Sequence, residues 1–380
     1  MIEKIEQLNI ELAGNCNLKC KMCTQASGRE ESFLSKLPVD LFYKAVDEAL
    51  PLGLKYVNIG GGGEPTIYRD LDKLIRYLTD NNVVTLMYTN AITIKENKFR
   101  KFCDAGLGAL KISAQGWDRE SYKEWMSIDA YDKIRGKILE FQEIIAKNNY
   151  PMLIQTNHLI HDTNQLEFQK NQYIKNWVDY LGIQAEIWID HNWTGSFDQE
   201  ESISRKNKFF NRKKRSCGRP LSNVVEIRAG GLESKHGAVV PCPNVLGRDS
   251  TAVMGHIQDS SLMEILNGSK MNSLREEHIN ETFNTEYCKN CDQLLDIPES
   301  LVWTNIKDRK YGESRISGMK LVQEYGRSTE IELKQLYNSN KDVFLIKTFL
   351  IKEISIDFSS LSFCINQNRL MITWFGIKNV

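Results

Sequence analysis

The sequence predicts an α/β fold, with a parallel sheet in the first half and a small cysteine-bearing region after it. Between residues 5 and 190, short apolar runs alternate with stretches of helical character. Strand–helix repeats of this kind build parallel sheets with right-handed crossovers. Four further cysteines lie between residues 217 and 291. Without a secretion signal, such a group indicates a metal site and not disulfides.

Six strands and five helices are expected in the first half. The apolar runs place strands at residues 7–13, 55–59, 83–89, 109–114, 152–156 and 186–190. The helical stretches cover residues 38–50, 70–80, 95–104, 131–147 and 165–181. Chemistry in parallel barrels gathers at the carboxyl ends of strands, so polar groups directly after each strand are the candidates for a site.

The first such group is a cysteine triplet. Cys16, Cys20 and Cys23 follow the first strand with the spacing C-x3-C-x2-C. Three thiolates can ligate only three irons of a [4Fe-4S] cube, whereas a cluster for electron transfer alone normally takes four cysteines. The triplet therefore predicts a cluster with one open iron that can bind a reactive ligand.

A glycine-rich segment follows the second strand. Residues 60–63 are all glycine and precede Glu64, and glycine lets a backbone approach a ligand closely. With the cysteine triplet, this segment resembles the radical S-adenosylmethionine (SAM) superfamily. The resemblance implies a partial (β/α)6 TIM-like barrel, a SAM-binding [4Fe-4S] cluster on the triplet, and SAM held through its amino group by Gly62, Gly63 and Glu64.

Further SAM contacts are expected at other strand ends. Polar side chains there could reach the ribose or carboxylate: Asn90, Ser113, Gln115, Gln155 and Asn157. Many relatives place an aromatic residue just before the third cysteine, against the adenine. Here Met22 takes that place, and its thioether can pack on a ring edge.

The second cysteine group is Cys217, Cys242, Cys288 and Cys291. On spacing alone, four thiolates can close a [4Fe-4S] cube or bind structural zinc. This region resembles the auxiliary-cluster domains called SPASM and Twitch. The resemblance lies in the glycine-containing hairpin before Cys242, the late C-x2-C pair and the sequence of residues 254–266. Full SPASM domains carry seven or more cysteines, so this resemblance implies one auxiliary [4Fe-4S] cluster in a small C-terminal domain. Of the other cysteines, Cys103 is expected to be a small buried side chain on an outer helix, and Cys364 is unassigned.

The expected domain boundaries follow from these features. Residues 1–190 form the barrel, 191–216 a charged connector, 217–297 the auxiliary-cluster domain and 298–380 a C-terminal extension without a functional account. The connector is either a solvated linker or a basic rim, at residues 205–215, for a phosphorylated substrate. The extension holds a helical or strand-like run at 343–354 and strand-like runs at 356–363 and 370–377.

Composition excludes several classes of protein. The formal net charge is zero, which argues against nucleic-acid binding. No run of 18 apolar residues and no signal-peptide core occur, so we expect no membrane span and a cytoplasmic location with reduced thiols.

The resemblance implies an enzyme that cleaves SAM reductively, with electrons from a flavodoxin or ferredoxin, and abstracts a hydrogen atom from a substrate. Oxidation is favoured, with the auxiliary cluster as electron acceptor, because no cysteine is placed as a hydrogen donor for epimerisation. The first strand begins within ten residues of Met1, so no leader-binding module for a peptide is expected. A carbohydrate or other small polar metabolite is the preferred substrate. Hydroxyl-binding candidates follow strands five and six: His158, Asp190, His191, Asn192 and Trp193.

Three alternatives stay open. The substrate radical could regain hydrogen, which makes the protein a radical epimerase of a carbohydrate. The protein could instead mature a peptide by forming a new bond. The third alternative, from another class, is a non-catalytic iron–sulfur electron-transfer protein, in which the glycine–glutamate segment has no role.

Overall fold

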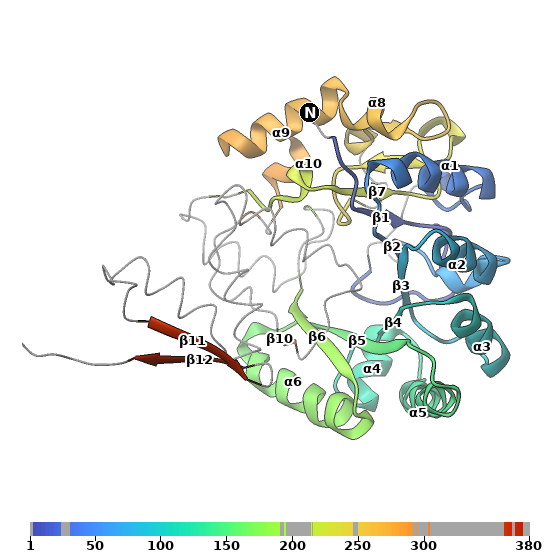
Figure 1. The fold of residues 1–380 in the computed structure, drawn as a ribbon, viewed down its shortest axis with the longest axis vertical. Coiled ribbons are helices and arrows are strands. Elements are labelled where there is room, and N and C mark those ends of the chain that lie inside the picture. Colours follow the sequence, from blue (N-terminus) through green and yellow to red (C-terminus); the bar gives the residue numbers. More distant parts are fainter. Residues whose placement is uncertain are drawn as a thin grey trace, which may run out of the picture.

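The computed structural model describes residues 3–23, 31–190, 194, 214, 216–245, 250–291, 294, 303–304, 361–366 and 369–374. Its centre is a curved sheet with helices along its convex side (Figure 1). His191, Asn192, Trp193, almost all of the connector and the run at 343–354 lie outside the described residues.

All six predicted strands are present in the first half. They are β1 Gln7–Ile10, β2 Tyr56–Ile59, β3 Val84–Thr89, β4 Ala109–Ser113, β5 Leu153–Ile160 and β6 Gln184–Ile189. Each pairs in parallel with the next, in chain order. The predicted partial (β/α)6 barrel is therefore confirmed.

The five predicted helices are also present, with one addition. They are α1 Val39–Ala49, α2 Leu71–Asp80, α3 Glu96–Ala105, α5 Tyr131–Asn148 and α6 Leu166–Tyr173, which continues as a π-helical turn over Ile174–Asp179. The unpredicted helix is α4, Arg119–Met126. Asp118 starts it, because its side chain accepts a 2.8 Å hydrogen bond from the Ser121 backbone N–H.

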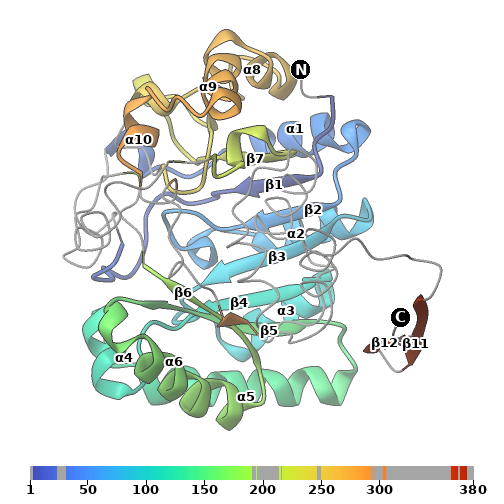
Figure 2. The ribbon, with the colours of Figure 1, turned by 90° about the vertical axis from the view of Figure 1, so that its left-hand side faces the viewer.

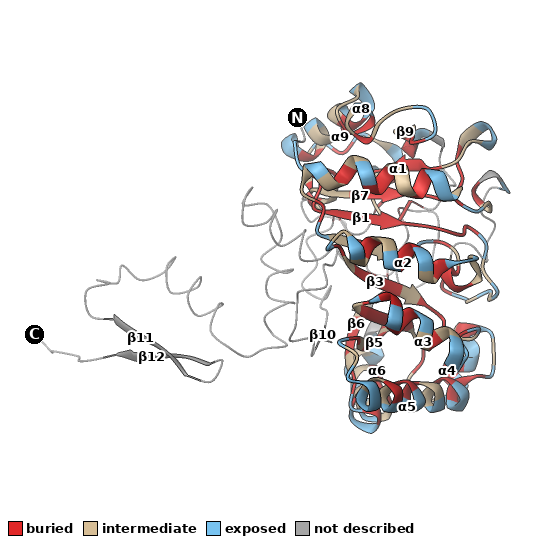
Figure 3. Ribbon diagram, turned by 45° about the vertical axis from the view of Figure 1, so that its right-hand side comes forward, coloured by how far each residue is buried: buried red, intermediate tan, exposed pale blue. Residues whose placement is uncertain are grey.

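The register gives the sheet two different faces. One in-register row is Ile10, Ile59, Met87, Leu110 and Ile154, which is buried and packs into the main hydrophobic core. Side chains alternate along a strand, so the neighbouring rows face the concave side. One of those rows is Tyr88, Lys111, Gln155 and Gln184. The helices cover the first face, with their own outer sides exposed (Figure 3). The second face, which carries this polar row, lines the barrel interior.

The C-terminal cysteine region extends this same sheet. Its first strand, β7 Val224–Ile227, pairs in parallel with β1, and β8 Ala238–Val240 and β9 Gly255–His256 follow antiparallel. Helices α8 Leu262–Leu266, α9 Ser269–Asn280 and α10 Glu286–Lys289 lie on the β7 side of the molecule (Figure 2). The barrel and the cysteine region therefore share backbone hydrogen bonds.

Two short pairings complete the described strands. β10 Trp303–Thr304 pairs antiparallel with β6, and β11 Leu361–Asn366 pairs antiparallel with β12 Arg369–Trp374. The two strand-like runs predicted near the C-terminus thus form a hairpin, with bounds shifted by several residues. Among the described residues, no helix is long and apolar enough to span a membrane.

Candidate active site and thiol pocket

The cysteine triplet lies on a loop after β1 that docks against α4. Cys16, Cys20 and Cys23 are half-buried and form no disulfide, and the Cys23 backbone N–H donates to the Cys20 carbonyl at 3.0 Å. The Lys21 backbone N–H donates to the Trp125 carbonyl at 2.8 Å, and Cys20 Sγ lies 3.9 Å from Met126 Sδ. The added helix α4 therefore positions the loop.

The three thiols lie close enough to influence one another. Burial raises the pKa of Cys16 to about 11 and that of Cys20 to about 12, and neighbouring thiols add to both shifts. Protonated thiols do not ligate metal, so iron has to displace protons here. Among the described residues, no three His, Cys, Asp or Glu side chains are placed to hold a single metal ion. A cubane needs no such set, because each thiolate binds a different iron.

The glycine loop after β2 rests on the cysteine loop. A Cβ at Gly63 would lie 1.9 Å from the Ala13 carbonyl oxygen, so only glycine fits. The Glu64 backbone N–H donates to the Asn15 carbonyl at 3.0 Å, directly before Cys16. The Gly62 N–H donates to the buried carboxylate of Glu11 at 2.6 Å.

The Glu64 carboxylate is buried and fixed from β3. Its Oε1 accepts from Thr89 Oγ1 at 2.6 Å, and its Oε2 accepts from the Asn90 backbone N–H at 2.9 Å. The Asn90 side-chain amide lies 3.8 Å from Cys16 Sγ and donates to Asn17 Oδ1 at 2.8 Å. Asn90 thus joins Glu64 to the cysteine loop, and three thiols beside one buried carboxylate fit an open cluster whose ligand carries an amino group that the carboxylate can hold.

The other predicted SAM contacts are spread over different positions. Ser113 ends β4 half-exposed, and Met22 is buried in the main core. Gln115 is buried, and its Oε1 accepts from the Leu159 N–H at 2.6 Å, which ties the loop after β4 to β5. The predicted end of strand five was wrong, because β5 runs to Ile160.

Gln155 and Asn157 therefore lie inside β5, on the concave face. In the register, Asn157 lies beside Ser113 and Gln155 lies beside Lys111. Four buried amide oxygens on this face have no hydrogen-bond partner among the described residues: those of Asn58, Gln155, Asn157 and Gln184. Buried polar groups are normally paired, so these oxygens indicate a missing donor.

His158 is not a hydroxyl-binding residue, contrary to the prediction. It lies on the helix-covered face, fully buried, with its ring stacked on Tyr173 at 4.6 Å between centroids. Its Nδ1 accepts from the Gly116 N–H at 3.2 Å. Burial holds its pKa well below the usual value, so the imidazole is neutral and structural.

Asp190 does reach the mouth of the barrel, with a partner that the sequence did not indicate. Its Oδ2 lies 2.9 Å from Nδ1 of His161, and both side chains are buried. Trp125 stacks on the His161 ring, and Lys21 of the cysteine loop lies over Trp125. The Nε2 atom of His161 has no hydrogen-bond partner among the described residues. Alternation along a longer β5 would have placed His161 on the concave side.

A buried ion pair deeper in the barrel was also missed. Lys111 Nζ donates to Glu186 Oε2 at 2.8 Å and to the Tyr88 hydroxyl at 3.0 Å. Lys111 and Glu186 are 0% and 2% exposed, so their charges are fully desolvated. The pair joins β4 to β6. The sequence did not predict it, because a single lysine within a strand does not indicate which acidic residue it contacts.

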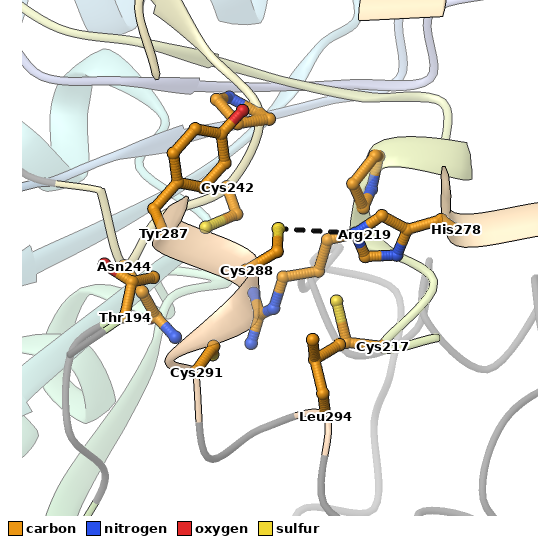
Figure 4. A pocket seen from close by; sticks show the side chains of 12 residues that line it. Thr194, Cys217, Arg219, Cys242, Asn244, His278, Tyr287, Cys288, Cys291 and Leu294 are labelled. Atoms are coloured by element: carbon orange, nitrogen blue, oxygen red, sulfur yellow. Dashed lines mark hydrogen bonds between the residues drawn. The ribbon is translucent and has the colours of Figure 1, made fainter. Parts of the chain in front are cut away.

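The four C-terminal cysteines line one pocket. Cys217, Cys242, Cys288 and Cys291 come from a loop before β7, a turn after β8 and the end of α10. Figure 4 shows the sulfur atoms of Cys217, Cys242 and Cys288 directed towards a shared space, with Arg219 reaching into it. Four thiols around one space, none of them in a disulfide, fit a closed cubane.

Of the remaining cysteines, Cys103 is a buried core residue on α3, as predicted. Cys364 lies in β11, and its side chain lies outside the described part of the chain.

Two family models match the chain. The radical SAM superfamily matches residues 10–166, and the iron–sulfur cluster-binding domain named SPASM matches residues 234–292. A "Probable GTP 3',8-cyclase" of Methanococcus maripaludis is 30% identical over 216 residues, which cover 55% of this chain and 70% of the relative. The protein of that name from Metallosphaera sedula is 30% identical over 44% of this chain and only 50% of its own length.

Two solved structures share the fold. Streptococcus suis SuiB bound to the precursor peptide SuiA has a TM-score of 0.56 and 17% identity, over 77% of this chain and 70% of that chain. BtrN in complex with AdoMet and 2-DOIA has a TM-score of 0.51 and 16% identity, over 77% of this chain and 94% of that chain.

Proposed function

We propose a function that starts from one premise: this chain belongs to the radical SAM superfamily. It is a radical SAM enzyme, with a SAM-binding [4Fe-4S] cluster, SAM and auxiliary iron–sulfur centres as cofactors. We propose that Cys16, Cys20 and Cys23 hold the SAM-binding cluster. The four cysteines of the C-terminal pocket would hold one auxiliary cluster.

The observation that carries this proposal is the joining of Glu64 to the cysteine loop through Asn90. We propose that the fixed carboxylate binds the SAM ammonium by a charge-assisted hydrogen bond, with Gly62 and Gly63 beside it. Ser113, Gln115, Asn157 and Met22 remain candidates for the other parts of SAM. When bound, SAM and its cluster would supply hydrogen-atom abstraction from carbon. The auxiliary cluster would supply an acceptor for one electron.

We propose that the reaction oxidises a sugar or similar polyhydroxylated metabolite. The amide oxygens of Asn58, Gln155 and Gln184, which have no hydrogen-bond partner in the described part of the chain, support this class, since sugar hydroxyl groups can donate to them. The buried Lys111–Glu186 pair beside them offers both signs of charge to a polar substrate.

Oxidation of an alcohol carbon must also release the hydroxyl proton. We propose His161 Nε2 as its acceptor, with Asp190 holding Nδ1–H in the manner of other carboxylate–histidine pairs. Loss of one hydrogen atom, one proton and one electron balances a two-electron oxidation. An external flavodoxin or ferredoxin and a cytoplasmic location complete the proposal.

A second candidate is formation of a new bond in a nucleotide, favoured by the 30% identity to the Methanococcus cyclase. Epimerisation and peptide maturation remain further candidates within the family. They differ from oxidation in the mass of the product, and one experiment separates them.

The test is anaerobic incubation of reconstituted protein with SAM, dithionite and cell-extract metabolites. We expect 5′-deoxyadenosine from the wild type and from Cys103→Ala, and none from Cys20→Ala. Iron should be about eight per chain, four for each cubane. Mass spectrometry should find a metabolite lighter by two hydrogens. An isomer with deuterium uptake would favour the epimerase, and a fully loaded protein that never forms 5′-deoxyadenosine would refute the whole proposal.

A further inference from the structure

We propose that His278 is a positioning residue that donates a hydrogen bond to Cys288 and thereby raises the reduction potential of the auxiliary cluster. This inference rests on the proposed cluster at the four C-terminal cysteines. His278 lies on α9, fully buried, and its Nε2 is 3.5 Å from Cys288 Sγ (Figure 4). A ligating thiolate has no proton, so across this contact only the imidazole can donate.

The Ser216 hydroxyl can serve as the partner of the other ring nitrogen of His278. The Gly218 backbone N–H donates to Ser216 Oγ at 3.1 Å, and that oxygen lies 2.9 Å from His278 Nδ1. Since the hydroxyl accepts from Gly218, its single proton is available for Nδ1. With the ring proton on Nε2, as a thiolate at Cys288 requires, Nδ1 accepts from this hydroxyl and both ring nitrogens have a partner. Ser216 is itself 1% exposed, so water does not compete for this bond.

The effect on the cluster follows from charge. Reduction adds negative charge to the cluster and its sulfurs, so a donor at one sulfur stabilises the reduced form more than the oxidised form. Hydrogen bonds to the sulfurs are one of the properties that set cluster potentials. Hydrogen bonds to charged groups are stronger than those between neutral groups, so a modest difference in bond strength between the reduced and oxidised forms changes the redox equilibrium about tenfold. For one electron a tenfold change is ~59 mV.

The experiment uses the full chain with Cys16, Cys20 and Cys23 all replaced by alanine, so that only the auxiliary cluster remains. Its potential is measured by redox titration followed by electron paramagnetic resonance. His278→Leu should shift the equilibrium about tenfold towards the oxidised cluster. His278→Gln, which keeps an N–H donor, should restore part of the potential. Ser216→Ala should give a smaller shift in the same direction as His278→Leu.

His256→Leu is the matched control, because His256 is a buried histidine of the same region that accepts from the Leu232 N–H and does not line the pocket. It should leave the potential unchanged. An unchanged potential in both His278→Leu and Ser216→Ala, at full iron content, would overturn the inference. A triple variant that assembles no cluster would remove the second cluster and this inference together. Formation of 5′-deoxyadenosine by the wild type would still stand in either case.

Discussion

Asn90 donates its backbone N–H to Oε2 of Glu64 at 2.9 Å, across 26 positions of sequence. The end of β3 thereby fixes the carboxylate on the loop after β2. The side-chain amide of the same residue lies 3.8 Å from Cys16 Sγ. One asparagine therefore links Glu64, which is proposed to hold the amino group of SAM, to Cys16, which is proposed to bind iron.

Glu64→Gln should weaken SAM binding at least about tenfold, because it removes the charge from a hydrogen bond that contributes about 1.5–3 kcal/mol. Anaerobic equilibrium dialysis of cluster-loaded protein measures the affinity. Glu143→Gln, on the exposed side of α5, is the control and should bind SAM as the wild type does. Equal affinity in both variants would remove Glu64 from the SAM site.

Gly63→Ala should separate the glycine loop from the cysteine loop. The added Cβ would lie 1.9 Å from the Ala13 carbonyl and 2.5 Å from that of Asn15, and neither backbone atom can swing away. We expect loss of SAM binding and less iron in the first cluster. Gly136→Ala is the opposite case, because nothing lies within 4 Å of its Cβ on helix α5. It should stabilise the fold by about 0.5–1 kcal/mol, and the midpoint of urea unfolding tests both variants.

Lys111→Met should destabilise the fold by about 3–5 kcal/mol, since it leaves the buried Glu186 carboxylate without its cation. The double variant Lys111→Met with Glu186→Leu should recover most of that loss, because it removes both buried charges. Urea unfolding at equal cluster content measures the difference. A double variant no more stable than the single one would contradict a mainly electrostatic coupling.

His161→Gln should lower substrate oxidation by about a hundredfold or more, the usual share of a proton acceptor. Formation of 5′-deoxyadenosine without substrate should not change. Asp190→Asn should act in the same direction, because it no longer holds Nδ1–H. His236→Gln, in the C-terminal region, serves as the control. Full oxidation by the His161 variant would exclude it as the proton acceptor.

Glu226→Gln should stabilise the protein at neutral pH. Burial raises the pKa of Glu226 above its ordinary 4.5, opposed by Arg228 and by the 2.6 Å hydrogen bond from Asn9. The native state thus holds this proton more tightly than the unfolded state does, and its contribution to stability is lost as the pH rises above 4.5 through the native pKa. The advantage of the variant should shrink as the pH is lowered towards 4.5, which melting temperatures between pH 5 and 8 would show.

Local sequence determined the chemistry of this protein. Cys16, Cys20 and Cys23 lie in one short segment and Gly62–Glu64 in another. The ability of each segment to bind a ligand can be predicted from its residue types and their spacing. The six strands were also predictable, because buried parallel strands are apolar runs. The strand-five boundary was the weak point: an end placed four residues early put His158 after the strand, whereas it lies inside β5 and is fully buried.

Only the tertiary structure decided which distant groups meet. Lys111 lies beside Glu186 across 75 residues, His161 beside Asp190 across 29, and β7 beside β1. These contacts depend on strand order, register and the curvature of the sheet, which long-range backbone hydrogen bonds fix together. The spacing of these residues in the sequence does not predict the contacts, because the partners become neighbours only when the strands pair in the folded sheet.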